Sequence, residues 1–423
     1  MISPGQYTKV ISTLKHTALL AAVAVLPFHW NYSNVLFSFF LLFWLLEARF
    51  GQKLQLLKQN IAIIGVLTAL FWLQVFGMTY ASDWLRAYKA VEYNFIMLLL
   101  PLAIFTSQPM EPKMVRRLCI VFVLGVVAGG LACEFKAFYL NITRNEPLHY
   151  LLRWRHTNNR LAQYISIDAN YLGMYVVAAI TILFYGLEQG LKRTMRIAAY
   201  VAMAFLFVFL LHLFSRLALM MAIVTVIFFV VRSKRYKLML SLVALAAVFF
   251  VLIFTVDSTL PVRLQRLNPF NEEKFDKRPK RWQALTELIQ QRPVFGTGSG
   301  NDVEPRQEIF KKYELNIAVE LQYNAHNQFL EYLITHGAVG LLLYLFVLFY
   351  LYRAGIANKS LLYVYLLSIF VLASQTESML DRNKGIIYFT LLNAVFFSAL
   401  LYKKATGKQP AHHQEEAANQ AHD

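Results

Sequence analysis

Charged side chains are scarce in this sequence. Asp, Glu, Lys and Arg make up 15% of its 423 residues, whereas 58% of the residues are hydrophobic. A water-soluble domain cannot cover its surface with so few charges, so this composition excludes an ordinary globular protein. The apolar residues also lack the two-residue alternation of a lipid-facing barrel strand. We therefore predict an all-α, polytopic membrane protein, because the α-helix is the other element that can span a bilayer.

Cysteine is also nearly absent. The two cysteines, Cys119 and Cys133, lie fourteen residues apart in one apolar segment. On a helix with a rise of ~1.5 Å per residue they are about 21 Å apart, which is too far for a disulfide between them. Cysteine usage therefore leaves the redox compartment of the chain undetermined.

Long apolar runs, in contrast, follow one another almost from end to end. A bilayer crossing needs about 20 apolar residues, and a window of about that length finds such segments near residues 17–31, 34–48, 60–80, 91–106, 117–140, 166–187, 195–213, 216–232, 237–256, 337–353, 360–376 and 385–402. These predict about 12 transmembrane helices, within a range of ten to thirteen because the first two segments are short. The first segment has the pattern of a secretory signal, but we interpret it as an uncleaved helix because no soluble sequence follows it.

The connections between these segments carry an uneven charge. Short connections on one side hold 20 Lys and Arg residues, and those on the other side hold 9. Cytoplasmic loops carry the excess of positive charge, so the count predicts that both termini are cytoplasmic and that the long connection faces the other side. We divide the chain into an N-terminal transmembrane bundle of about nine helices (1–256), a large outer loop (257–336), C-terminal transmembrane helices (337–402) and a disordered tail (403–423).

The outer loop begins with a basic stretch and continues into an amphipathic segment. Four apolar side chains recur there at helical spacing: Trp282, Leu285, Leu288 and Ile289. This pattern is typical of a short helix that lies at a membrane surface. Its cationic edge fits either an anchor to lipid headgroups or a site for an anionic ligand.

Arg216 is the most unusual cation of the apolar region, because it follows Ser215 between two apolar runs. An arginine so close to hydrocarbon costs about 2.5–3.5 kcal/mol on insertion unless it snorkels to the interface or binds an anion. The preceding outer connection is also basic, with Arg144, Arg153, Arg155, His156 and Arg160. Arg216 and this connection both place positive charge on the outer side of the membrane, where the positive-inside rule predicts little of it. We therefore expect cations to surround an anionic ligand at the outer face, with a simple interfacial arginine as the alternative for Arg216.

Two further features of the outer loop have less specific signals. The segment Pro293–Asn301 contains three glycines that could let backbone amides approach a phosphate, but it lacks the preceding strand of a dinucleotide fold. We interpret it as a flexible turn. His326 stands at the start of the next helix, where a lone histidine is more often a cap or packing residue than a catalyst.

Together, these motifs resemble the O-antigen ligase family, which shares a core with O-antigen polymerases and bacterial protein O-oligosaccharyltransferases. The similarity lies in residues 215–345, and the motifs follow in the family's order: Ser215-Arg216-Leu217-Ala218-Leu219, Arg281-Trp282-Gln283-Ala284-Leu285, Pro293 to Gly300, Ala325-His326-Asn327-Gln328-Phe329-Leu330-Glu331, and Gly337. Asp168 to Tyr171 stands where many relatives have a stretch that contains His-Pro. The resemblance therefore assigns no function to that segment.

The resemblance implies transfer of a glycan from undecaprenyl pyrophosphate to a sugar hydroxyl of an acceptor such as lipid A-core. The reaction would take place at the periplasmic face of a bacterial inner membrane, with no metal, nucleotide or other cofactor. Arg216 and Arg281 would bind the pyrophosphate, since guanidinium groups pair with phosphate in a bidentate manner. His326 would act as general base on the acceptor hydroxyl. Second-rank candidates for substrate binding are Arg160, Arg153, Asn327 and His336.

Other functions stay open at this point. A polymerase or a protein O-oligosaccharyltransferase would share these motifs, and membrane lipids are expected neighbours in every case, whereas a nucleic-acid partner is not expected. From another class, a 12-helix secondary transporter is the alternative, but the apolar segments are nearly free of Asp and Glu, and transporters place such groups at the midplane. A scaffold without activity would leave Arg216 unexplained. The acceptor, the glycan and the oligomeric state are not determined by the sequence.

Overall fold

The computed structural model describes residues 4–233 and 278–407, and within these ranges the chain is helical, without a β-strand. Seven helical segments of the described part are long and apolar enough to cross a bilayer. They are α3 (Phe50–Met78), α4 with α5 (Trp84–Tyr93 and Ile96–Phe105), α6 (Pro112–Thr143), α8 (Ala169–Glu188), α9 (Arg193–Leu213), α16 (Gln328–Ala357) and α18 (Asn383–Thr406). The prediction of an all-α, multi-pass membrane protein is confirmed for these residues.

The other described helices are shorter or less apolar. Four of them belong to the bundle: α1 (Pro4–Ala24), α2 (Trp30–Leu46), α10 (Arg216–Ser233) and α17 (Leu361–Ser374). The rest lie in connections: η1 (Leu148–Leu152), η2 (Trp154–His156), α7 (Asn159–Ala162), η3 (Gln163–Ile165), α13 (Arg278–Gln291), α14 (Val303–Lys312), α15 (Asn316–Glu320) and η4 (Met379–Asp381). Every predicted apolar segment within the described residues overlaps a helix, whereas the segment at 237–256 lies outside them. The total of about 12 spans stays a prediction.

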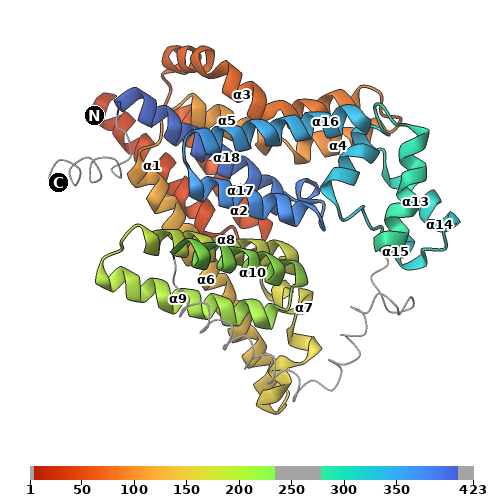
Figure 1. The fold of residues 1–423 in the computed structure, drawn as a ribbon. Coiled ribbons are helices and arrows are strands. Elements are labelled where there is room, and N and C mark those ends of the chain that lie inside the picture. Colours follow the sequence, from red (N-terminus) through yellow and green to blue (C-terminus); the bar gives the residue numbers. More distant parts are fainter. Residues whose placement is uncertain (1–3, 234–277, 408–423) are drawn as a thin grey trace.

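The bundle has two distinct ends (Figure 1). The start of α1 and the end of α18 lie at one end, and the connection formed by α13, α14 and α15 lies at the other. Helices α8, α10, α16 and α18 begin at the end that carries α13–α15, so their first residues can meet there. This end is where the candidate site forms.

Helix α16 begins at Gln328, within the range assigned to the outer loop, and it is interrupted at Gly337, where the predicted apolar span starts. The limit of the loop at residue 336 stays a prediction. The first turns of α16 are polar, with Gln328, Glu331, Thr335 and His336 all buried. A hydropathy window misses such turns because protein, not lipid, surrounds their side chains. Helix α18 ends at Thr406, and most of the predicted tail lies outside the described residues, so the tail stays a prediction.

Helix α16 is interrupted at Gly337, whose φ of 63° and ψ of −159° are not helical. The interruption frees backbone groups on both sides, and the glycine-containing segment after α13 pairs with them. Thr297 and Gly298 donate to the carbonyls of Ile334 and Thr335 at 2.9 Å, and Ala338 donates to Pro293 at 2.8 Å. Irregular backbone in a membrane protein is tolerated where protein satisfies it in this way. The predicted turn at Pro293–Asn301 is thus a turn, and it braces the broken helix.

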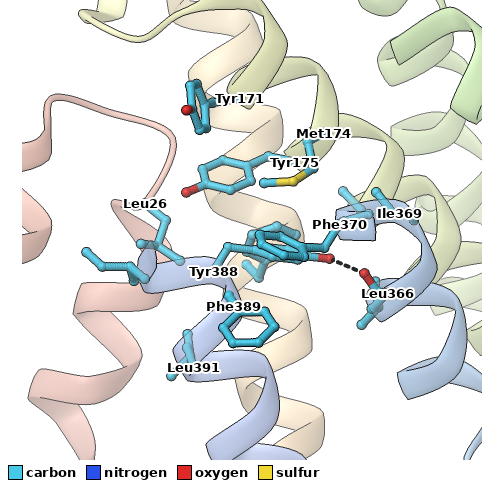
Figure 2. Packing of buried hydrophobic residues seen from close by; sticks show 14 of the residues in the cluster. Leu26, Tyr171, Met174, Tyr175, Leu366, Ile369, Phe370, Tyr388, Phe389 and Leu391 are labelled. Carbon is cyan, nitrogen blue, oxygen red and sulfur yellow. Dashed lines mark hydrogen bonds between the residues drawn. The ribbon is translucent and has the colours of Figure 1, made fainter. Parts of the chain in front are cut away.

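An aromatic core joins α8, α17 and α18 (Figure 2). Tyr388 stacks on Tyr175 with ring centroids 5.9 Å apart and on Phe370 at 6.2 Å. The Tyr388 hydroxyl donates to the carbonyl of Leu366 at 3.1 Å, so its polar end is satisfied within the core. Since lipid is as apolar as these side chains, close packing and hydrogen bonds hold the helices together. The core therefore fixes the first turns of α8 and α18 relative to each other.

The outer connection has a small core of its own. Its buried residues come from α13, α14, α15 and the start of α16, and they include Leu285, Leu288 and Phe310. The amphipathic helix predicted around Trp282 is thus α13, but its apolar face packs against protein instead of lying free for a membrane surface. This packing sets the position of Arg281 at the start of the helix.

Candidate functional site

A cavity of about 1950 Å³ lies at the end of the bundle that carries α13–α15. Arg216, Arg281 and His326, which come from three separate sequence motifs, all line it. Asp168 and Glu377 also line it, and Glu377 contacts His326. The three residues expected to carry chemistry are therefore brought to one place by the fold.

The backbone on either side of His326 is held by neighbouring elements. The indole of Trp282 donates to the carbonyl of Ala325 at 2.8 Å, and the Ala325 amide donates to the Glu331 carboxylate at 2.9 Å. Asn324 donates to Asp381 at 3.0 Å. Because Trp282 follows Arg281, the hydrogen bond from its indole links the Arg281 motif to the His326 motif.

The cap of α16 is Asn327. Its side-chain oxygen accepts the amides of Phe329 at 2.9 Å and Leu330 at 3.1 Å, and its amide group donates to the carbonyl of Gln375 at 3.0 Å. Asparagine is among the best N-cap residues, so this role needs no ligand. The capping role considered for His326 from sequence is thus filled by the next residue.

His326 is instead paired with a carboxylate. Its Nδ1 lies 2.8 Å from Oε1 of Glu377, and the other carboxylate oxygen accepts the Asn170 amide at 2.8 Å. The Asn170 oxygen in turn accepts a hydrogen bond from Ser215 at 3.3 Å. With Nδ1 donating to Glu377, Nε2 carries the lone pair of the neutral ring. A chain of hydrogen bonds therefore connects His326 to the residue that precedes Arg216.

The electrostatics of Glu377 suit this pairing. Burial alone would raise the pKa of its carboxyl group, but the hydrogen bond and charge of His326 and the amide of Asn170 lower the pKa below its ordinary value. The carboxylate is therefore ionised at neutral pH. A buried, ionised carboxylate on Nδ1 holds the imidazole in one tautomer and stabilises its protonated form.

The arginines that line the cavity differ in what surrounds their charge. Arg306 is buried and forms ion pairs with Asp302 and Glu331, which hold the pKa of its guanidinium above the usual range despite burial. Its charge is therefore neutralised by protein. Arg281 is also buried, with its guanidinium 4.9 Å from the ring of Tyr323.

Arg216 and Arg382 are exposed in the cavity, and in the part of the chain that the structure describes their guanidinium groups have no hydrogen bond or ion pair. Arg216 is the first residue of α10, and the apolar residues Leu217 and Met220 follow it along the same wall. Both guanidinium groups are thus available to a ligand.

The second-rank candidates have surroundings of their own. Arg153 stacks over the ring of Tyr150 at 3.3 Å, and Arg160 is exposed on α7. His336 is buried beside the interruption of α16, and Asn327 is the cap described above. None of these four is among the residues that line the cavity.

Sequence reasoning missed Glu377 and Asn170. Glu377 stands in the connection between two apolar segments, and the positive-inside rule takes only Lys and Arg of such connections into account. A carboxylate next to a predicted membrane segment was the available signal for it. Asn170 gave no signal, because an asparagine in the first turn of a helix is common. Within the described ranges, no group of three or more His, Cys, Asp and Glu side chains could hold a metal ion.

Comparison with known proteins agrees with this geometry. The family model described as O-antigen ligase matches residues 199–345, a stretch that includes Arg216, Arg281 and His326. The resemblance seen in the motifs is thereby confirmed. The match supports a membrane glycosyltransferase of the superfamily that contains O-antigen ligases and polymerases. No curated protein matches the chain.

Proposed function

We propose that this membrane protein, which is similar to O-antigen ligases over residues 199–345, transfers a glycan from undecaprenyl pyrophosphate to a sugar hydroxyl of a glycolipid such as lipid A-core. The observation that carries the proposal is the meeting of Arg216, Arg281 and the pair His326–Glu377 at one cavity. Arginines suit an anionic leaving group, and a carboxylate-held imidazole suits a hydroxyl acceptor.

At the donor side, the bond between the anomeric carbon and the pyrophosphate oxygen breaks. Negative charge then grows on the leaving pyrophosphate, and the guanidinium groups of Arg216 and Arg281 stabilise that charge. The apolar side chains of Leu217 and Met220, next to Arg216 on the cavity wall, suit the lipid chain of the donor. Arg216 thus stands where a polar headgroup meets a hydrocarbon tail.

At the acceptor side, His326 takes the hydroxyl proton on Nε2 as the oxygen attacks the anomeric carbon. The ring becomes an imidazolium with Nδ1 donating to Glu377, and the carboxylate of Glu377 stabilises its positive charge. Asn170 keeps Glu377 in place through the second carboxylate oxygen. General-base catalysis of this kind contributes about 10²- to 10⁴-fold to a rate.

The site faces the periplasm in this proposal, with both termini in the cytoplasm of a bacterium and the chain in its inner membrane. The start of α1 and the end of α18 lie at the end of the bundle opposite α13–α15 (Figure 1), which supports a placement on opposite sides of the membrane. The charge count of the connections supports the cytoplasm as the side of the termini. A cysteine in place of the exposed Lys311 on α14, in a protein without Cys119 and Cys133, tests it. We expect labelling by a membrane-impermeant maleimide in intact spheroplasts, and labelling only after lysis would reverse the orientation.

Purified protein in nanodiscs tests the reaction. We expect transfer from an undecaprenyl pyrophosphate-linked oligosaccharide to rough lipopolysaccharide, with release of undecaprenyl pyrophosphate. Elongation of the donor glycan without that acceptor would indicate a polymerase, and transfer to a polypeptide would indicate a protein O-oligosaccharyltransferase. Flux of a solute across the bilayer with no transfer at all would favour a transporter.

A further inference from the structure

Asp168 occupies an N-cap position without acting as a cap. Aspartate at this position usually accepts a backbone amide of the first turn, but the side chain of Asp168 makes no such bond at the start of α8. The Ala169 amide donates instead to the side-chain oxygen of Asn159 at 2.8 Å. Asp168 is exposed and lines the cavity. Its carboxylate is therefore available on the cavity wall.

Arg382 lies within electrostatic reach of this carboxylate. Although the residue is exposed to the cavity, partial desolvation by the surrounding protein raises the pKa of the Asp168 carboxyl group, and the charge of Glu377 raises it too, whereas the charges of Arg382 and His326 lower it. Despite their opposite charges, Asp168 and Arg382 form no ion pair in the described structure. Both groups belong to the wall of one cavity, and the residues that follow them in α8 and α18 meet, since the Tyr175 hydroxyl donates to the Lys384 carbonyl at 2.8 Å.

The backbone of both residues is fixed. The carbonyl of Asp168 accepts the amide of Leu172 at 3.0 Å in α8. Arg382 is the N-cap residue of α18, and its carbonyl accepts the amides of Gly385 at 3.0 Å and Ile386 at 3.1 Å. The aromatic core of Figure 2 joins these two helices. The backbone from which the carboxylate and the guanidinium extend is therefore preorganised.

The charges of the pair select the kind of group that can bind between them. An anion would meet Asp168, and a cation would meet Arg382. A sugar ring carries vicinal hydroxyls that donate to a carboxylate, which only accepts, and accept from a guanidinium, which only donates. A neutral, hydroxyl-rich group therefore satisfies both residues at once.

We propose that Asp168 and Arg382 form the acceptor-sugar subsite of the cavity and determine acceptor specificity. This inference rests on the proposed glycosyl transfer and names the part of the site that the acceptor uses. Asp168 shares its surroundings with His326 and Glu377, which act on the acceptor hydroxyl, whereas Arg216 and Arg281 serve the donor. Asp168 and Arg382 are positioning residues, since the proton moves to His326.

Steady-state kinetics of the variants Asp168→Asn and Arg382→Gln test the inference. The purified protein in nanodiscs receives an undecaprenyl pyrophosphate-linked oligosaccharide as donor and rough lipopolysaccharide as acceptor, and each is titrated at a saturating level of the other. Loss of a hydrogen bond to a charged group weakens binding roughly 10- to 100-fold. We expect the acceptor KM to rise roughly tenfold or more in each variant, with the donor KM unchanged.

Two controls carry the same chemical changes outside the cavity. Glu308→Gln and Lys311→Gln remove charges from exposed positions of α14 that do not line the cavity, so we expect wild-type kinetics from both. A variant whose acceptor KM equals that of wild type overturns the subsite, and so does a fall in kcat with both KM values unchanged. If Asp168→Asn yields no folded protein, Arg382→Gln alone decides by the same criteria.

The wild-type reaction separates this inference from the proposed function. Wild-type protein that transfers no glycan to rough lipopolysaccharide contradicts the proposed function, and the subsite is then withdrawn with it. Wild-type protein that transfers the glycan, together with an unchanged acceptor KM in both variants, contradicts the subsite alone.

Discussion

Nδ1 of His326 lies 2.8 Å from a carboxylate oxygen of Glu377, although 51 residues separate them in the sequence. Glu377→Gln keeps the size of the side chain but removes the charge that stabilises the imidazolium. We expect turnover to fall by about 10²-fold or more, because a carboxamide can also favour the wrong tautomer, while the donor KM stays nearly constant. Transfer kinetics measure this, with Glu308→Gln on α14 as the control. Wild-type turnover in Glu377→Gln would remove the pair from the mechanism.

His326 and Asn327 are adjacent but have different roles, which two substitutions separate. His326→Asn removes the base and should lower turnover by about 10²- to 10⁴-fold, with thermal stability preserved. Asn327→Ala removes the cap of α16 and should lower the free energy of unfolding by about 1 kcal/mol, with turnover per folded molecule preserved. Parallel melting curves and transfer assays distinguish them. Equal loss of activity and stability in His326→Asn would make His326 a packing residue.

Arg216 should not tolerate lysine. A bidentate grip on phosphate needs the planar guanidinium, whereas a cation that only reaches the interface would accept an ammonium group. We expect Arg216→Lys to lose nearly as much activity as Arg216→Ala while inserting normally. Arg193→Lys, at the first residue of α9, is the matched control at the start of another spanning helix. Full activity of Arg216→Lys would assign Arg216 to the interface alone.

Gly337 should not tolerate a side chain. Its backbone lies in a region used almost exclusively by glycine, and a Cβ there would stand 2.3 Å from the carbonyl carbon and oxygen of Val294. We expect Gly337→Ala to lower the free energy of unfolding by about 1–3 kcal/mol. Gly65→Ala, where an added Cβ meets nothing within 4 Å, should be neutral or stabilising. Thermal unfolding in detergent compares the two, and equal melting temperatures would mean that the interruption of α16 adapts to a side chain.

The sequence predicted well those features that depend on local chemistry. A helix in lipid needs a certain length of apolar residues, so α3, α6 and α9 could be placed from hydropathy. The motifs around Arg216, Arg281 and His326 were enough for the family resemblance, because motif order and spacing are properties of the chain itself. The same local reasoning gave no sign of the helical turns from Gln328 to His336, which are polar and buried in protein.

Tertiary structure decided which side chains meet. Asn170 reaches Glu377 across 207 positions, and Tyr171 of the same turn of α8 donates to the Ser378 carbonyl across 207 positions. No sequence window spans such a distance, and the partners are determined by how helix ends pack against one another. Hydropathy and motifs therefore predicted a membrane protein with a basic site. The contact between the Glu377 carboxylate and the His326 ring, in contrast, depends on how α8 and α16 pack against the connection after α17.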